Sequence, residues 1–206
     1  MNKPKFSYLF PKKKTEQDLP TTNAKKAVLV LFTLFLNLYI EYKPYSTTPH
    51  QITSASEYLF AIYHFIINQT LGIVHEGGHG VCYILPCPKF VMVAMGTIFQ
   101  WLFPLGIAYY YKRKGNMTAF LIGLFILGIS MDHTAFYMST AHEGPILPAY
   151  KSFLGVDAMH DFHYIFTSLG VLAYESWISG VTKAIAYLLM IGSVVVMFFE
   201  AFRETQ

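Results

Sequence analysis

The sequence has few charged residues for its length. Only 13% of its 206 residues are Asp, Glu, Lys or Arg, whereas 54% are hydrophobic. A soluble domain of this size carries about 25% charged residues. With long apolar runs, this deficit excludes an ordinary soluble domain and predicts an integral membrane protein in contact with the lipid bilayer. The net charge of +3 comes from the amino-terminal tail and gives no reason to expect a nucleic-acid partner.

Cysteine is also scarce. Cys82 and Cys87 are the only two, and their spacing matches neither a Cys-x-x-Cys metal knuckle nor a disulfide framework. We therefore expect both side chains to be apolar fillers near the end of a helix, with no part in metal binding or cross-linking.

The first 26 residues differ from the rest of the chain, because seven of the 15 Lys and Arg lie there. The segment is too long and too charged for an ordinary signal peptide, and no small-residue cleavage site follows the next apolar run. We interpret residues 1–26 as a disordered, basic cytoplasmic tail and residues 27–206 as a single transmembrane domain. Strictly alternating crossings then place the charges of residues 112–114 outside, against the positive-inside tendency.

Apolar segments predict the fold. A helix needs about 20 residues to cross a bilayer, so we predict an all-α, polytopic transmembrane helix bundle with about five or six membrane segments. The prolines of "LPCPK" end the second segment, and "KFVMVAMG" after them suits a re-entrant strand covered by other protein or a cavity. The long segments are 27–42, 58–85, 90–111, 117–138 and 180–202, and a shorter amphipathic one is 158–174.

The second apolar segment carries polar residues at helical spacing. At about 100° per residue, five of them share one narrow arc, while the other faces are apolar. Lipid cannot solvate such a stripe, so it is expected to face the bundle interior or a wet cavity. The members of this stripe are Glu57, His64, Asn68, His75 and His79.

Residues 75–79, "HEGGH", form the His-Glu-x-x-His pattern. On a helix, His75 and His79 are one turn apart and can bind one metal ion, while Glu76 points aside and can act as a base. We expect the ion to be Zn2+, which lowers the pKa of a bound water to about 7. The glycines of this segment leave room for a substrate or another backbone. A buried hydrogen-bond cluster without metal is the alternative.

Candidates for a third ligand occur among the later polar residues. If Asp157 caps a helix running to about Tyr174, its polar face contains Asp161, with His160 at the edge and His163 turned away. Asp161 is therefore the first candidate. His160 is the second, either as a ligand or as a residue that orients the site.

Several other polar residues each allow two interpretations. Gln100 can donate to a substrate carbonyl or make an interhelical hydrogen bond. Asp132 and His133 lie deep in the fourth segment, where a satisfied structural pair is favoured over a donor beside the metal. His64 and Asn68, from the polar stripe, are candidates for supporting the site or for binding substrate.

Four stretches carry a resemblance to known proteins. At these residues the chain resembles the site-2 protease class of intramembrane zinc metalloproteases, and more closely a poorly characterised bacterial group of membrane proteins related to it. The resemblance covers about residues 71–172. The stretches are "HEGGHG" (75–80), "GTIFQWLFPLGIAYYYKRKG" (96–115), "SMDHTAFYMSTAHEGPIL" (130–147) and "HDFHYIFTSLGVL" (160–172).

The resemblance implies that His75 and His79 are metal ligands, that Glu76 is the catalytic base, and that a later helix supplies a third ligand. In site-2 proteases that ligand is an Asp. It also implies a multi-pass protein of the bacterial inner membrane. The second motif of that class, Asn…Pro…Asp-Gly, is absent: Gln100 and Pro104 stand in the corresponding stretch, and no Asp-Gly pair occurs in the chain.

The sequence is therefore compatible with three functions. The leading one is a membrane-embedded zinc metallohydrolase that cuts an unwound transmembrane peptide or membrane-protein substrate. The second is a non-catalytic metal-binding membrane protein. The third is a di-iron membrane oxygenase with histidine boxes at "HEGGH" and "HDFH". Two irons need about as many histidines as the eight in the whole chain, and no His-His doublet exists.

Overall fold

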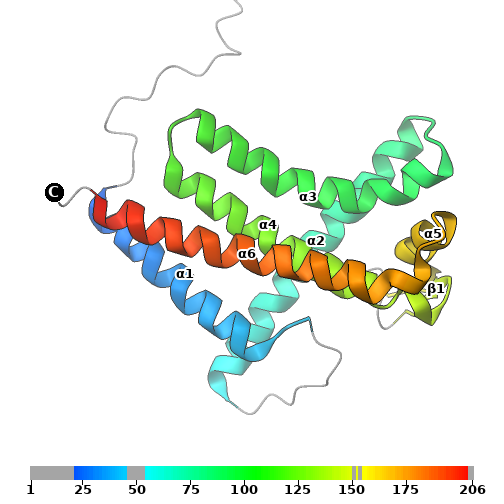
Figure 1. Ribbon diagram of the computed structural model, residues 1–206, viewed down its shortest axis with the longest axis horizontal. Helices are drawn as coiled ribbons and strands as arrows, with labels where there is room; N and C mark the ends of the chain where they lie inside the picture. The colour runs from blue at the N-terminus through cyan, green and yellow to red at the C-terminus, as the bar shows by residue number, and fades with distance from the viewer. Residues whose placement is uncertain (1–20, 46–53, 150–151, 153–154, 204–206) are drawn as a thin grey trace, which may run out of the picture.

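The computed structural model describes residues 21–45, 54–149, 152 and 155–203, and these are almost entirely helical (Figure 1). Most of the expected 1–26 tail lies outside the described residues, and the first helix already begins at Thr22, five residues before the expected start. Two short strands and two 3-10 turns lie between the fourth and sixth helices. In chain order, the elements are α1 (Thr22–Tyr42), α2 (Ala55–Ile84), α3 (Lys89–Arg113), α4 (Met117–Met138), η3 (Ala141–Glu143), β1 (Ile146–Leu147), β2 (Ala158–Met159), α5 (Asp161–Ser168), η4 (Leu172–Tyr174) and α6 (Glu175–Phe202).

Local sequence signals explain where the helices begin. The Thr21 hydroxyl accepts a hydrogen bond from the Ala24 N–H at the start of α1, and Asn116 does the same at the start of α4. At the start of α2, Ser54 and Glu57 form a reciprocal capping box, with the Ser54 N–H donating to the Glu57 carboxylate over 2.7 Å. Glu57, the first member of the polar stripe, therefore accepts a hydrogen bond from a backbone N–H at the start of the helix.

Two expectations for the turn after α2 were wrong. Residues 90–97 are not a re-entrant strand, because α3 runs unbroken from Lys89 to Arg113. Pro88 precedes its first residue, where a missing N–H costs nothing, and a helix pairs its own backbone groups without partner strands. Cys82 and Cys87 are not fillers but form a disulfide across this turn. The two cysteines are only five positions apart in the sequence, so the turn alone brings their side chains together.

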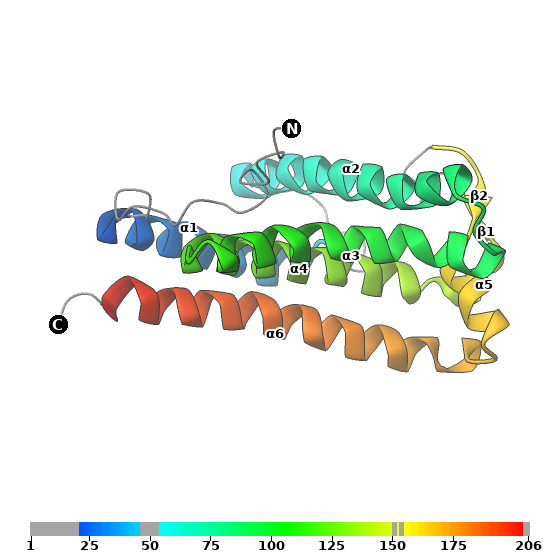
Figure 2. The ribbon, with the colours of Figure 1, turned by 90° about the horizontal axis from the view of Figure 1, so that it is seen from above.

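The long helices form layers around α4. This helix packs against α6 on one side and α3 on the other, α2 packs on α3, and α1 packs on α6; Figure 2 shows the layers from above. The largest core cluster joins α1, α2, α4 and α6 and includes Tyr39, Phe60, Phe125 and Met190. The short helix α5 lies at one end of this bundle (Figure 1).

Four helical stretches are long and apolar enough to cross a membrane: Thr22–Tyr42, Lys89–Arg113, Met117–Glu143 and Leu172–Phe202. Helix α2 has 30 residues but carries the polar stripe. The chain is therefore a helical, multi-pass membrane protein by length and composition, and the segment expected at residues 158–174 is a β-strand residue pair, a short helix and a turn.

The two ends of the bundle have different characters. At one end the start of α1, the start of α4 and the end of α6 meet in a cluster that includes Leu29, Leu121 and Met197. Lys26 lies over the Phe202 ring and Lys112 over the Phe120 ring. We call this the basic end; the opposite end, which holds the α2–α3 turn and α5, is called the site end.

This arrangement differs from strictly alternating crossings. Helix α1 ends before it reaches the site end, and α2 extends over the remaining length. The chain therefore reaches the site end only where α2 finishes (Figures 1 and 2). The α3–α4 turn with Lys112, Arg113 and Lys114 consequently lies at the same end as the start of α1. These three charges and those of Lys25 and Lys26 therefore share one end of the molecule.

Candidate metal centre

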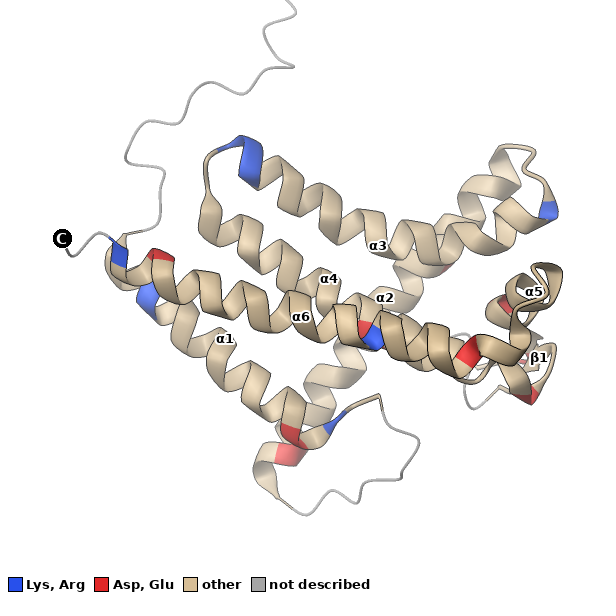
Figure 3. Ribbon diagram, in the orientation of Figure 1, with Lys and Arg blue, Asp and Glu red and all other residues tan. Residues whose placement is uncertain are grey.

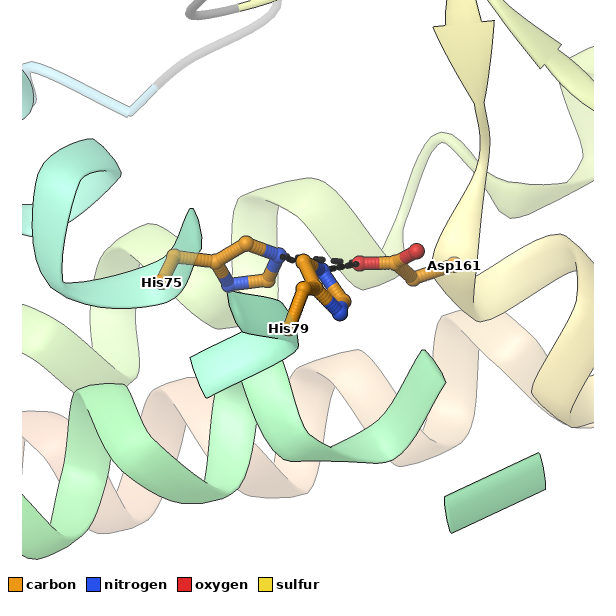
Figure 4. A group of neighbouring side chains, drawn as sticks. All are labelled: His75, His79 and Asp161. Carbon is orange, nitrogen blue, oxygen red and sulfur yellow. Dashed lines mark hydrogen bonds and ion pairs between the residues drawn. The ribbon is translucent and has the colours of Figure 1, made fainter. Parts of the chain in front are cut away.

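Three side chains from two elements converge at the site end. His75 and His79 project from consecutive turns of α2, and Asp161 is the first residue of α5 (Figure 4). The Asp161 Oδ2 atom lies 2.9 Å from His75 Nε2 and 3.2 Å from His79 Nε2, and the two nitrogens are 3.1 Å apart. One atom from each residue lies within 4.8 Å of the others, a grouping that could hold a metal ion.

The local structure that positions Asp161 differs from the one predicted from the sequence. Asp157 does not cap a helix; its carboxylate accepts a hydrogen bond from the Ala149 N–H. Helix α5 begins only at Asp161, whose own N–H donates to the Tyr137 hydroxyl over 3.0 Å. Asp161 is only 5% exposed. Burial raises the pKa of its carboxyl group, but hydrogen bonds and attraction from His75 and His79 outweigh this and leave the pKa lowered.

His160 lies next to Asp161 but points elsewhere. Its Nδ1 accepts from the His163 N–H as the N-cap of α5, and its Nε2 is 3.1 Å from the Thr140 hydroxyl. That hydroxyl already donates to the Tyr137 carbonyl, so it accepts a hydrogen from His160 Nε2. Burial lowers the pKa of His160 to about 4. Both ring nitrogens are thus engaged away from the cluster.

Hydrogen bonds fix the orientation of both histidine rings in α2. His79 Nδ1 is 2.8 Å from the Met92 carbonyl, which can only accept, so Nδ1 carries the hydrogen. His75 Nδ1 is 3.2 Å from Gln100 Oε1. The Gln100 amide is oriented by its other end, because its Nε2 donates to the Ser130 carbonyl. His75 Nδ1 therefore carries a hydrogen too.

In the neutral form of each ring, both Nε2 atoms therefore present lone pairs to one another and to a carboxylate oxygen. Three electron-rich atoms this close repel unless a cation lies among them, either a proton or a metal ion. Two nitrogens bound about 2.0–2.1 Å from one tetrahedral zinc ion lie roughly 3.3 Å apart, close to the 3.1 Å observed. Two histidines and one carboxylate also match the ligand set of catalytic zinc sites, which leave a position open.

Gly96 makes room for the ring tips. A Cβ atom at this position of α3 would lie 2.5 Å from His75 Nε2 and 2.6 Å from His79 Nε2. Gly78 serves the packing of α2 on α3, because a Cβ there would overlap the Met95 carbonyl. Gly77, in contrast, has open space beside it. The glycine that the two histidine rings of the candidate centre require is therefore on the neighbouring helix.

A cavity of about 570 Å³ opens onto the cluster. Glu76 lines it together with His75 and His79. Tyr83, which is 79% exposed, also lines it, so the cavity reaches the surface at the last turn of α2. Its walls combine polar groups with apolar ones from α3, α4 and the β1–β2 pair: Asn68, Gln69, Met92, Val93, His133, Phe136, Tyr137, Thr140, Leu147, Ala158 and Met159.

His133 and Asn68 contribute polar groups to the cavity wall. His133 Nδ1 accepts from Gln100 Nε2 over 3.2 Å, which leaves the hydrogen on His133 Nε2. Asn68 Oδ1 accepts from the Tyr45 hydroxyl over 2.7 Å. Gln100 thus connects a candidate ligand, His75, to a cavity-lining donor, His133, and it is itself only 1% exposed.

Asp132 and His64 lie outside the cluster. Asp132 accepts from the Tyr39 hydroxyl over 2.8 Å, and its other oxygen is 3.7 Å from Lys183 Nζ. His64 packs edge-on against the Tyr45 ring, and within the described residues its buried Nε2 has no hydrogen-bond partner. The Asp132–His133 pair expected from the sequence is therefore divided: Asp132 joins helices, whereas His133 faces the cavity.

Three contributors to the cluster could not be identified from the sequence. Gly96 and the Met92 carbonyl carry no side-chain signal, and they matter only because α3 packs on α2. Tyr137 supports the Asp161 backbone and stacks on His160 with ring centres 4.5 Å apart. Its one sequence signal is its position inside a stretch rich in polar and aromatic residues.

Comparisons with protein-family models, with curated proteins and with solved structures each gave no match.

Proposed function

We propose that this protein is a membrane-embedded zinc-dependent hydrolase of the site-2 protease type that cleaves peptide bonds. The observation that carries the proposal is the convergence of His75 Nε2, His79 Nε2 and the Asp161 carboxylate, with both Nδ1 hydrogens engaged elsewhere. Glu76 lines the same cavity, which supports it as the candidate base. Asp161 supplies the third ligand that the resemblance leads one to expect, although it follows no Asp-Gly motif.

The residues fit a single zinc ion. A bound zinc ion lowers the pKa of water to about 7 and polarises a carbonyl group. His75, His79 and Asp161 would hold it, and Gly96 leaves room for the Nε2 atoms of the two histidines. Within the described residues no second grouping of three metal-ligating side chains occurs, so nothing favours the di-iron oxygenase.

The remaining chemistry belongs to the chain's own side chains. Glu76 accepts the proton of the attacking water and returns it to the leaving amine. His133, whose Nε2–H is set by Gln100, donates a hydrogen bond to the substrate carbonyl oxygen and stabilises the negative charge that develops there. The substrate segment enters the cavity as an extended peptide, because a helical backbone hides its carbonyls inside its own hydrogen bonds.

Elemental analysis of the detergent-purified protein tests the metal. We expect about one zinc per wild-type chain and none in the His75→Ala/His79→Ala double variant. Iron in place of zinc would favour oxygen chemistry at the same two-histidine, one-carboxylate set. A chain without metal after purification under metal-replete conditions would leave a protonated histidine cluster and refute the proposal.

Glu76→Gln separates a hydrolase from a metal-binding protein. The variant keeps the three ligands, so it should retain its zinc, yet it lacks the base. Cleavage of a dye-labelled, unfolded protein such as casein in detergent should fall by about 10²-fold or more. Equal cleavage by the two zinc-loaded proteins would count against Glu76 as base. Gln69→Asn, a change at another cavity residue of α2, is the matched control.

A further inference from the structure

The proposed function leaves open the side of the membrane on which the metal centre receives its substrate, and this inference rests on that function. We propose that the site end faces the oxidising, non-cytoplasmic side. The substrate is then a peptide segment of a membrane or secreted protein that reaches the cavity from outside the cytoplasm. Two independent features carry the orientation: a disulfide and a distribution of charge.

The disulfide lies beside the cavity mouth. Cys82 and Cys87 join the last turn of α2 to the turn before α3. Cys82 is three residues from His79 and next to Tyr83, both of which line the cavity. Disulfides form and persist in oxidising compartments and are rare in the reducing cytoplasm. The cavity mouth and this bond lie at the same end of α2 and therefore on the same side of the membrane.

The distribution of charged residues supports the same orientation. Figure 3 shows Lys and Arg gathered where α1 begins, where α3 meets α4 and where α6 ends. These residues are Lys25, Lys26, Lys112, Arg113, Lys114 and Arg203, and five further lysines precede Lys25 in the sequence.

The site end has the opposite balance. Among its described residues Lys89 is the one lysine, and no arginine occurs there. One further lysine, Lys151, lies between β1 and β2 in the sequence. Its carboxylates include Glu143, Asp157 and Glu175, and His142 pairs with Glu175. Because cytoplasmic loops of membrane proteins carry the excess of Lys and Arg, the basic end belongs in the cytoplasm and the site end outside. Charge and disulfide thus assign the same orientation.

Cysteine labelling of the whole protein in intact cells tests this orientation. The native pair is oxidised and does not react with maleimide, so a single added cysteine reports its own position. Val156→Cys marks the site end, where Val156 is 56% exposed and does not line the cavity. Met117→Cys marks the basic end at the start of α4, where Met117 is 40% exposed. Both replaced residues are uncharged, so the charge difference between the ends is unchanged.

We expect a membrane-impermeant maleimide, applied to bacterial cells with a permeabilised outer membrane, to label Val156→Cys at once. Met117→Cys should be labelled only after the inner membrane is lysed. The reverse order would overturn the proposal, as would labelling of both positions before lysis, since that would mean two orientations. The unaltered protein, which should stay unlabelled until a reductant is added, is the control.

A second measurement does not depend on added cysteines. Cells are quenched with acid, free thiols are blocked, and the protein is reduced and treated with a mass-adding maleimide. A shift for two thiols shows that the native pair was oxidised in the cell. No shift would show two free thiols and remove the argument from the disulfide.

The labelling results are distinguishable from failure of the proposed function. Zinc content is measured on the same preparations. External labelling of Val156→Cys in a protein without zinc would keep the orientation and refute the hydrolase. Zinc in a protein whose site end is labelled only after lysis would keep the metal centre and refute the orientation.

Discussion

At the scale of single residues, the position of one atom decides what a side chain can do. Asp161 and His160 are neighbours on the chain, and the sequence ranked them by an assumed helix from Asp157 to Tyr174. That helix does not exist. Asp161 nevertheless reaches the two histidines because α5 begins at this residue, and a start of that kind depends on contacts with Tyr137 and Thr140. The sequence favoured Asp161, whose carboxylate does lie beside the two histidines, but the local structure that brings it there could not be predicted.

Asp161→Asn and His160→Asn form a matched pair at adjacent positions. Loss of the carboxylate charge from a ligand should weaken zinc binding, measured by chelator competition, by more than the roughly 10- to 100-fold typical of losing a group that merely orients a ligand. Asn at 160 can still cap α5, so its zinc affinity should remain within a few-fold of wild type. A larger loss for His160→Asn than for Asp161→Asn would reverse the assignment.

Gln100 orients His75 through one amide oxygen. In Gln100→Ala the His75 Nδ1–H loses its acceptor over 3.2 Å, and the ring is free to turn. Zinc affinity should fall about 10- to 100-fold while far-ultraviolet circular dichroism stays unchanged. Ser130→Ala is the control, because it removes the hydroxyl bond to the Gln100 carbonyl but keeps the Ser130 carbonyl. Equal losses in the two variants would indicate general loosening of the α3–α4 contact.

At the scale of elements, hydrophobic segments predicted the five long helices to within a few residues. Apolar length and breaking residues are local properties, so the sequence reports them directly. The re-entrant strand was wrong because β-branched residues and methionines such as those of 90–95 adopt whichever structure their packing favours. The pairing of Cys82 with Cys87 also escaped prediction, since it depends on the geometry of one turn.

The close contact between α2 and α3 allows us to predict how alanine substitutions at two glycines of α3 affect zinc affinity. Gly96→Ala places a methyl group 2.5–2.6 Å from both Nε2 atoms, so the rings must move apart. We expect at least a 10-fold loss of zinc affinity, of the order seen when ligand orientation is disturbed. Gly106→Ala, ten residues along the same helix, meets nothing within 4 Å and should retain zinc. It should gain up to about 1 kcal/mol of stability from helix propensity. Unchanged zinc affinity in Gly96→Ala would contradict the observed approach of the histidine tips.

At the scale of the whole molecule, polar residues inside the bundle serve two separate purposes. The stripe on α2 predicted an interior cavity, and its carboxyl-terminal half does line one. The second polar group, Asp132 with Tyr39 and Lys183, joins α4 to α1 and α6. Composition indicated that both groups must avoid lipid, but only the packing of distant helices shows which faces a cavity and which holds helices together.

Tyr39→Phe distinguishes these two purposes. The variant keeps the ring, which is 1% exposed, but leaves the Asp132 oxygen without its donor in the bundle interior. A buried acceptor left unpaired costs about 1–3 kcal/mol, so the thermal unfolding midpoint in detergent should fall. Zinc per folded chain should not change, because Asp132 is not part of the metal grouping. Tyr109→Phe, which removes a hydroxyl from a side chain 60% exposed on α3, should alter neither quantity. Loss of zinc in Tyr39→Phe at temperatures where the chain is folded would instead tie the Asp132 group to the metal centre, since the two would then respond as one unit.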